Sequence, residues 1–285
     1  MATVYDKSSL FLAPSGVSNG TVFVQKPVPI YGSEQVTNGD FSQTGAELIT
    51  NGDFATDSDW NKGAGWSISG GKLRAGDVDN INAFQAQVFT NGKTYKVTYT
   101  ISDYTKGSVR FQFGGGGDTV NGQINSSNGV YTEYILATVN HTSARFRGQS
   151  TDEGFTGSVD NVSVKEVGQD WTLASGWSIG EDKALFDGGG VAANILQTNV
   201  FESGKTYKIT FDTLDTNGGN LAYRVSSAGF VFINAIAANT KHTITATAAS
   251  SGGISLRGAD NFAGSITNIS VKEVLSPDGD FTFTR

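Results

Sequence analysis

The 285-residue sequence contains no cysteine, two histidines and four prolines. The absence of cysteine excludes disulfide bonds and thiolate metal sites. His141 and His242 are the only imidazoles and there is no thiol, so the sequence offers few residues for the usual catalytic pair of a nucleophile and a base. No apolar run approaches the roughly 18 residues that cross a bilayer, and the first residues lack the apolar stretch of a signal peptide. We therefore expect no membrane partner and no export by the general secretory route.

Positive charge is also scarce, with 20 Lys and Arg against 27 Asp and Glu and a net charge of −7. This balance argues against a nucleic-acid-binding surface. A glycosidase needs two carboxylates about 5–10 Å apart. Asp57, Asp59 and Glu133 are candidates, but any sequence this acidic supplies such pairs. We expect no enzyme activity and assign no catalytic residue.

Glycine and aromatic residues are plentiful, at 37 residues and 11% respectively. That mixture suits many short strands joined by tight turns. Two segments alternate apolar and polar residues, with the apolar positions at Tyr95, Val97, Tyr99 and Ile101 and at Tyr207, Ile209 and Phe211. Strict alternation predicts antiparallel strands with one buried face. The spacing of Val159, Val162 and Val164 breaks the alternation and predicts a bulge at Asp160-Asn161.

The sequence also repeats itself. Three pairs of matching segments begin, in the same order, at Asp59 and Asp170, at Gly92 and Gly204, and at Gly157 and Gly264, with offsets of 111, 112 and 107 residues. A repeat of this length is a whole domain rather than a solenoid unit. We predict an all-β chain with two tandem jelly-roll β-sandwiches, at residues 35–167 and 168–274.

The ends of the chain form the remaining parts of the prediction. Residues 1–34 predict an anchor hairpin followed by a stiff Pro-Val-Pro linker. Residues 275–285 predict a C-terminal strand that completes the anchor. The tetrapeptide Asn38-Gly39-Asp40-Phe41 recurs at Asn51-Gly52-Asp53-Phe54. We interpret the second copy as the start of the first sandwich, and the first copy as an extra edge strand or a connector.

The opening Leu48–Phe54, followed by Trp60 and Trp66, and the closing Ser158–Val164 resemble carbohydrate-binding modules of the family 4/9 type. The resemblance implies jelly rolls that bind glycans on a sheet face or at a loop edge. It also implies a calcium ion in the first sandwich, with Asp53 and Asp160 as ligands, although Asp53 could simply cap a turn. In the second sandwich Thr267 stands where Asp160 would be, so we expect no calcium there.

Four residues are candidates for contacting sugar. Trp60 and Trp171 lie in loop-like stretches and could stack on a sugar ring. Arg110 and Gln112 flank Phe111 on the expected wet face of a strand and could bond sugar hydroxyls, or could belong to an ordinary solvated face. For the other two tryptophans, at identical Gly-Trp-Ser-Ile sites, we predict burial in the sandwich cores.

The chain ends carry a second resemblance. The segment from Val4 to Gly16 and the segment from Gly279 to Arg285 resemble the opening of virion structural proteins of marine-type tailed bacteriophages. This implies a location on the virion surface, as a fibre, spike or decoration component. Its partners would be other virion proteins, copies of itself, as in fibre trimers, and surface glycans. The alternatives are a purely structural virion cement or spacer, and an accessory glycan-binding module of a secreted bacterial enzyme.

Overall fold

The structure is a computed structural model that describes residues 9–10, 24–25, 29–149, 153–189, 193–234, 236–237, 239–259 and 262–276. Every regular element within these ranges is a β-strand, which confirms the predicted all-β fold. No helix suited to crossing a membrane occurs in this described part of the chain.

The chain folds into two compact units that are nested in sequence. Residues 40–189 form one unit, which we call the inserted unit. Residues 1–39 and 190–285 form the other, which we call the host unit. This division differs from two units that simply follow one another along the chain, because the host unit has one piece before the inserted unit and one after it.

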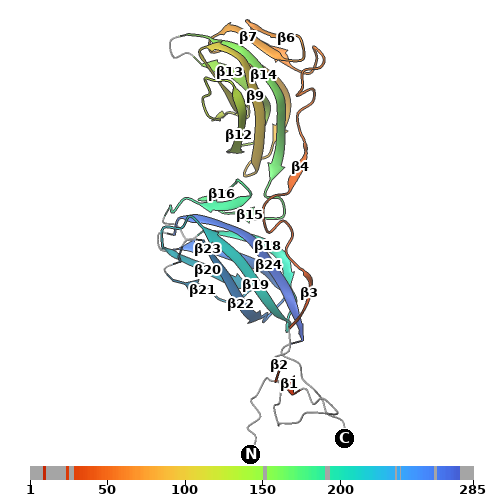
Figure 1. Cartoon of the computed structure of the whole chain (residues 1–285), viewed down its shortest axis with the longest axis vertical. Coiled ribbons are helices and arrows are strands. Elements are labelled where there is room, and N and C mark those ends of the chain that lie inside the picture. Colours follow the sequence, from red (N-terminus) through yellow and green to blue (C-terminus); the bar gives the residue numbers. More distant parts are fainter. Residues whose placement is uncertain are drawn as a thin grey trace, which may run out of the picture. The chain divides into compact units, whose positions relative to one another are not determined.

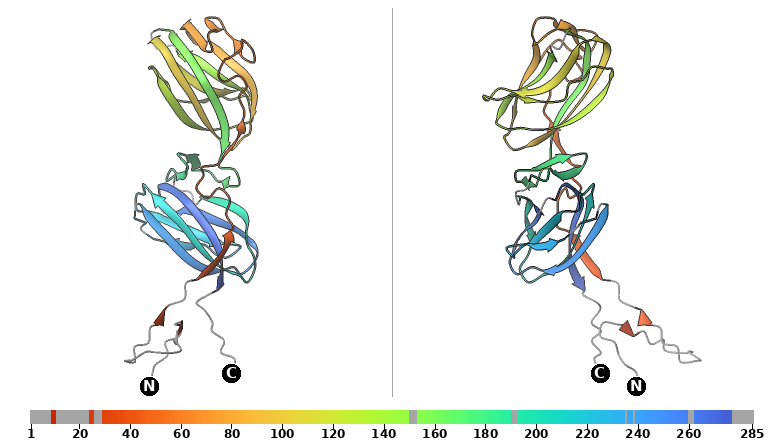
Figure 2. Two further views of the ribbon diagram at one scale, coloured as in Figure 1. Left: turned by 45° about the vertical axis from the view of Figure 1, so that its right-hand side comes forward. Right: turned by 90° about the vertical axis from the view of Figure 1, so that its left-hand side faces the viewer.

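The inserted unit contains a sandwich of two antiparallel sheets, which face one another in Figure 2. The first sheet has the strand order β11-β10-β13-β8-β5. Its strands are β5 (Asn61–Lys62), β8 (Asn82–Phe89), β10 (Ser108–Gly114), β11 (Val120–Asn121) and β13 (His141–Gln149). The second sheet has the order β12-β9-β14-β7-β6, and β4 pairs with β14 (Figure 1). Its strands are β4 (Thr44–Glu47), β6 (Trp66–Ile68), β7 (Leu73–Val78), β9 (Thr94–Lys106), β12 (Gly129–Leu136) and β14 (Phe155–Val167).

The alternation in sequence decides which side chains fill this sandwich. Val97 and Tyr99 of β9, Phe111 and Phe113 of β10, and Phe146 of β13 are all buried between the sheets. Trp66 is buried as predicted, and its indole N–H donates to the carbonyl of Ile81 over 3.0 Å. The register between β14 and β9 shifts between Asp160 and Ser163, which confirms the predicted bulge.

The host unit repeats the same arrangement. One sheet contains β18 (Ala193–Phe201), β23 (Gly252–Ala259), β20 (Asn220–Val225) and β21 (Val231–Ile233), paired in that order. The other contains β3 (Ile30–Glu34), β24 (Gly264–Ser276), β19 (Thr206–Leu214) and β22 (Thr240–Thr247), again paired in that order (Figure 1). The order β18-β23-β20 matches β8-β13-β10, and β3-β24-β19-β22 matches β4-β14-β9-β12. The sequence repeat is therefore a repeat of strand order.

Three short strands follow the first sandwich within residues 40–189. They are β15 (Thr172–Leu173), β16 (Trp177–Gly180) and β17 (Lys183–Phe186). Strands β16 and β17 form an antiparallel hairpin in which Trp177 is opposite Phe186, as Trp66 is opposite Ala75 in the hairpin of β6 and β7. Trp177 is buried, as predicted.

The two Asn-Gly-Asp-Phe segments hold equivalent positions, one at β14 of the inserted unit and one at β24 of the host unit. Val162 donates its backbone N–H to the carbonyl of Gly52 over 2.8 Å, and Ile269 donates to Gly39 over 2.9 Å. A Cβ on Gly52 would lie 2.0 Å from the carbonyl oxygen of Val162, so only glycine permits this approach. The first copy therefore contacts β24 as the second copy contacts β14, whereas from the sequence we expect an extra edge strand or a connector.

The predicted anchor is described only in part. Strands β1 (Ser9–Leu10) and β2 (Val24–Gln25) pair antiparallel, as the predicted hairpin requires. Strand β24 of the host unit continues to Ser276. Residues 277–285, which carry the predicted C-terminal strand, lie outside the described residues.

Candidate functional site

The structure corrects the two tryptophans predicted to stack on sugar. Trp60 and Trp171 are each only 4% exposed, which leaves no ring face for a ligand. Trp60 packs against Phe54, with ring centroids 5.3 Å apart, and donates its indole N–H to the carbonyl of Asn51. Trp171 packs in the same way against Phe41, at 5.4 Å. Each tryptophan anchors the phenylalanine of an Asn-Gly-Asp-Phe segment, so both belong to the cores.

Gln112 lies on the predicted strand face but is only 2% exposed. Its amide N–H donates to the side-chain oxygen of Asn121 over 2.5 Å, because β11 pairs with β10 at this position and covers it. Gln112 therefore positions Asn121 and does not itself reach a ligand.

Arg110 does lie on the outer face of the sheet, the side turned away from the core. It is half-buried, and the described residues offer its guanidinium no hydrogen-bond partner. Its Nε is buried and unpaired, which leaves the terminal nitrogens as its donors. Burial, followed by the charge of Arg147, lowers the pKa of Arg110 below its usual range.

The strand registers place the neighbours of Arg110 in two rows across the outer face. One row consists of Asn82, Arg147 and Arg110 on β8, β13 and β10. The next row consists of Phe84, Arg145, Gln112 and Asn121 on β8, β13, β10 and β11. Phe84 is 37% exposed, so an aromatic ring lies at the edge of a surface of guanidinium and amide groups. We call Asn82, Phe84, Arg110, Arg145 and Arg147 the arginine face of the inserted unit.

The host unit has a corresponding surface. Asn194, Arg257, Ala222 and Phe232 form one row on β18, β23, β20 and β21. The Asn194–Arg257 pair thus repeats the pair Asn82–Arg147. Arg224 lies one row away, opposite Ser255, and its guanidinium donates to the Ser255 hydroxyl over 3.2 Å.

Aromatic rings flank the arginines of the host unit. The guanidinium carbons of Arg224 and Arg257 each lie 4.8 Å from the ring centroid of Phe230. Phe232 is 47% exposed, and Arg257 lies 5.9 Å from its ring. We call Asn194, Arg224, Phe230, Phe232 and Arg257 the arginine face of the host unit.

Sequence reasoning found one arginine of the five on these faces. The chain has seven arginines in all, and the sites it missed are Arg145, Arg147, Arg224 and Arg257. The signal was present, because Arg145 and Arg147 flank the buried Phe146 just as Arg110 and Gln112 flank Phe111. Because side chains alternate between the two faces of a strand, Arg145 and Arg147 lie on the face of β13 opposite to Phe146, as Arg110 and Gln112 lie on the face of β10 opposite to Phe111.

The acidic residues considered for glycosidase chemistry do not come together. Asp57 pairs with Lys62, and Asp59 accepts a hydrogen bond from Ser58 over 2.6 Å. Glu133 is buried, and its carboxylate accepts from the Tyr99 hydroxyl at 2.5 Å and from the backbone N–H of Gln123 at 2.7 Å. Burial, and then the charge of Glu133, raises the pKa of Tyr99 well above its usual range.

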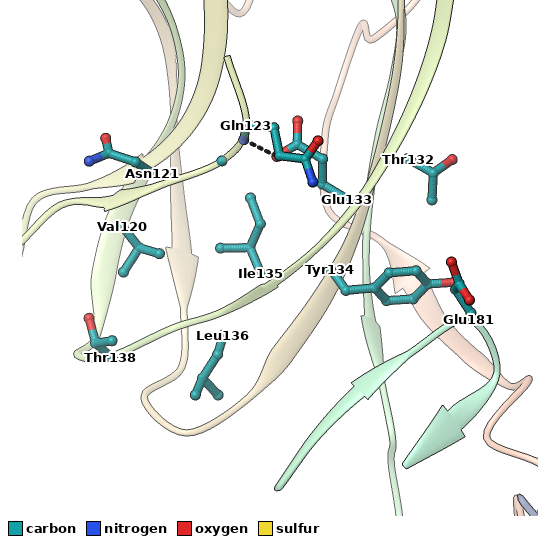
Figure 3. Close-up of a pocket in the computed structure, with 11 residues that line it drawn as sticks. Val120, Asn121, Gln123, Thr132, Glu133, Tyr134, Ile135, Leu136, Thr138 and Glu181 are labelled. Carbon is teal, nitrogen blue, oxygen red and sulfur yellow. Dashed lines mark hydrogen bonds between the residues drawn. The ribbon is translucent and has the colours of Figure 1, made fainter. Parts of the chain in front are cut away.

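Glu133 also borders an open depression of about 780 Å³, shown in Figure 3. The depression is lined by β11, β12 and Glu181, and Figure 3 shows the backbone N–H of Gln123 directed at the Glu133 carboxylate. Both oxygens of Glu133 already accept hydrogen bonds, and the carboxylate of Glu181 forms an ion pair with Lys183 at 3.6 Å.

Asp53 and Asp160 lie on segments that meet where Gly52 contacts Val162. Each carboxylate is bound locally, Asp53 by the N–H of Ala55 and Asp160 by the N–H of Asn161. Within the described ranges, no group of three His, Cys, Asp or Glu side chains is arranged to hold a metal ion. Calcium at Asp53 and Asp160 therefore stays a prediction of the resemblance.

The sequence matches no protein-family model and no curated protein. Among solved structures, allantoicase from Saccharomyces cerevisiae is 11% identical, with a TM-score of 0.31 over 71% of this chain and 80% of its own. A Paenibacillus xanthan lyase is 17% identical, with a TM-score of 0.27 over 90% of this chain but 27% of its own. An Arthrobacter globiformis isomalto-dextranase complexed with panose is 12% identical, with a TM-score of 0.23 over 72% of this chain and 36% of its own. Likenesses this weak carry no argument about function.

Proposed function

We propose that this protein is a non-catalytic surface protein that binds glycans on the arginine faces of its two sandwich units. One observation carries the proposal: the guanidinium of Arg110 has no hydrogen-bond partner among the described residues, and its sheet face also presents amides and the exposed ring of Phe84. Hydrogen-bond donors beside an aromatic ring are what a sheet needs to hold a sugar, whose hydroxyls accept bonds and whose C–H face packs on a ring.

The repeat supports the proposal because weak sites gain from being linked. A shallow face that makes one stacking contact and a few hydrogen bonds would bind with a dissociation constant of roughly 10 µM to 1 mM. Two linked sites on one polymer raise the overall affinity by about 10²–10⁴ when both engage. The host and inserted units each present such a face in one chain.

The setting we propose is the virion surface, as the resemblance of the chain ends implies. The paired strands β1 and β2 are compatible with an anchor hairpin. Other virion proteins and copies of this chain would be the partners that complete so small an anchor. Immunogold labelling of intact particles, with antibodies raised against the inserted unit, tests this setting. Label on the particle surface supports it, and label absent from purified particles contradicts it.

A glycan array probed with a multimerised full chain tests the binding function. The wild type is expected to retain a subset of glycans, and Arg110→Gln to reduce the signal while Arg74→Gln does not. Arg74 is the matched control, because it lies on β7 beside Asp103 at 3.5 Å, away from both arginine faces. If every glycan stays silent, the purely structural role of a virion cement or spacer replaces this proposal.

A further inference from the structure

The arginine face of the inserted unit brings together positive charges that form no ion pair within the described part of the unit. Arg110 and Arg147 are direct partners across β10 and β13, and Arg145 is two residues from Arg147 along the same strand. Side chains directly opposite on antiparallel strands have Cβ atoms about 4.5–5.5 Å apart, and like charges at that spacing destabilise a sheet. None of the three arginines forms an ion pair with a carboxylate in the described structure.

The polar contacts that these arginines do make are with neutral groups. Arg147 donates to the side-chain oxygen of Asn80 over 3.0 Å, and Arg145 donates to the Ser143 hydroxyl over 2.8 Å. The Nε atoms of Arg110 and Arg147 are buried without partners. Charge is thus concentrated and fixed in place, in a chain whose net charge is −7.

The host unit repeats the feature with a different set of residues. Arg257 corresponds to Arg147, and Ala222 stands at the position that corresponds to Arg110. The second positive charge of the host unit comes instead from Arg224, two residues further along β20. The Nε atoms of Arg224 and Arg257 are also buried and unpaired, and neither arginine has a carboxylate partner among the described residues. Both units therefore present two neighbouring guanidinium groups on the corresponding sheet face, directly opposite one another for Arg110 and Arg147 and diagonally placed for Arg224 and Arg257.

We infer that the ligand of these faces is an anionic polysaccharide, whose carboxylate or sulfate groups the paired arginines bind. This inference rests on the proposed glycan-binding function and specifies its ligand class. A guanidinium presents its N–H groups in a planar fork that matches a carboxylate or a sulfate with two parallel hydrogen bonds. An anion between Arg110 and Arg147 would also remove the repulsion that the unliganded face contains.

A polysaccharide fits these faces better than a nucleic acid does. Nucleic-acid binding draws its affinity from many lysines and arginines spread along a phosphate backbone. Here the positive groups are confined to a few positions on an acidic protein, next to the exposed rings Phe84 and Phe232. The rings supply apolar surface for a sugar face, and the arginines bind its acidic substituent.

The test is titration calorimetry on the full chain with four probes: oligogalacturonate for carboxylate, dextran sulfate for sulfate, unmodified dextran as the neutral glycan, and single-stranded DNA. We expect one of the two acidic glycans to bind at least about tenfold more tightly than dextran, the equivalent of one charge-assisted hydrogen bond. Affinity should fall about tenfold in Arg110→Gln and in Arg257→Gln, and less in Arg110→Lys, which keeps the charge without the fork. Arg74→Gln should bind like the wild type.

The outcomes separate this inference from the function on which it rests. Dextran binding as tightly as the acidic glycans would overturn the anionic ligand class and leave glycan binding in place. DNA binding as tightly as the acidic glycans, with no loss in either glutamine variant, would show unselective attraction and also overturn it. Silence from all glycans, here and on the array, would overturn the proposed function itself. Should Arg110→Gln fail to fold, Arg257→Gln decides alone, because its arginine is in the other unit.

Discussion

Arg110 on β10 and Arg147 on β13 lie directly opposite each other, and no carboxylate in the described structure lies between or beside them as an ion-pair partner. Two positive charges in register on a sheet weaken that sheet. Selection for stability alone would favour removing one of them. Their juxtaposition is what an anion-binding surface requires.

The first prediction is therefore that removing one arginine of this pair weakens glycan binding without lowering the free energy of unfolding. Arg110→Gln should leave the free energy of unfolding unchanged or raise it by up to about 1 kcal/mol, because it removes the repulsion across β10 and β13. The same variant should lose glycan affinity. Chemical denaturation measures the first quantity, with Arg74→Gln as the control. A loss of more than about 1 kcal/mol in Arg110→Gln would show that the pair supports the fold, contrary to this account.

The second prediction concerns the nesting of the units. The Glu34 carboxylate accepts bonds from the Ser270 hydroxyl at 2.5 Å and the Val271 N–H at 2.6 Å. Removing it should destabilise the host unit by about 1–2 kcal/mol, as expected for hydrogen bonds to a charged group. In hydrogen exchange, Glu34→Ala should expose peptides from β24 and β19.

Glu47 provides the matched variant for the inserted unit. It accepts bonds from the Ser163 hydroxyl at 2.5 Å and the Val164 N–H at 2.8 Å, in the same geometry. Glu47→Ala should expose peptides from β14 and β9 and spare those from β24. If Glu34→Ala instead loosened β14, the assignment of residues 29–39 to the host unit would be wrong.

The third prediction is a pH dependence that arises from Tyr99. Its pKa is raised by burial and by the nearby Glu133 carboxylate, so the folded state holds the phenolic proton more tightly than the unfolded chain does. This contribution to stability is fully present below about pH 10, where unfolded tyrosines titrate. Above that pH, the free energy of unfolding should fall by about 1.4 kcal/mol per pH unit.

Denaturant unfolding of the wild type and of Tyr99→Phe, at several values between pH 9 and pH 11.5, tests this prediction. The variant loses the bond to Glu133, so its stability at pH 9 should be lower by about 1–3 kcal/mol. Its slope above pH 10 should be shallower than that of the wild type. Parallel slopes would mean that Tyr99 ionises as easily in the folded protein as in the unfolded chain.

The fourth prediction follows from the resemblance to carbohydrate-binding modules. Calcium at a hundredfold excess over its dissociation constant should raise the free energy of unfolding by about 2.7 kcal/mol, through Asp53 and Asp160 of the inserted unit. Asp53→Asn should abolish the gain, whereas Asp40→Asn, at the equivalent position of the first Asn-Gly-Asp-Phe segment, should retain it. Thermal melts with calcium and with a chelator decide the matter. Identical melting temperatures with calcium and with the chelator would contradict calcium binding at Asp53 and Asp160.

Alternation in the sequence was sufficient to predict the fold and the buried faces. Val97, Tyr99, Phe111 and Phe113 are buried as their period of two requires, and the break at Asp160-Asn161 is a bulge. These features are local, since a strand buried on one face shows its pattern in its own residues.

The nesting of the units could have been found, but only by comparing two different offsets. The match of Asn38-Gly39-Asp40-Phe41 with its second copy extends back to Glu34 and Glu47, at the same separation of 13 residues. The rest of the repeat has offsets near 110 residues. Two copies of the opening segment that lie 13 residues apart, followed by two copies of the remaining domain sequence about 110 residues apart, are the pattern of one domain inserted into another.

The errors in the predicted site have a different cause. Trp60 and Trp171 follow acidic residues in irregular segments, and nothing in their neighbourhood shows that a phenylalanine from a preceding turn will cover them. Gln112 is covered by β11, a strand of two residues that has no pattern of its own. Contacts of this kind depend on tertiary packing, which a single sequence does not display.

The most direct test of the central claim is an NMR titration that follows the arginine side-chain Nε–H signals of the full chain. Lysine variants at Arg110, Arg147, Arg257 and Arg74 assign the signals. On addition of the acidic oligosaccharide that binds most tightly, the signals of Arg110, Arg147 and Arg257 should shift with one saturation curve, and the signal of Arg74 should not move. Binding that leaves these three signals in place, or that moves Arg74 as much as the others, would contradict a glycan site on the arginine faces.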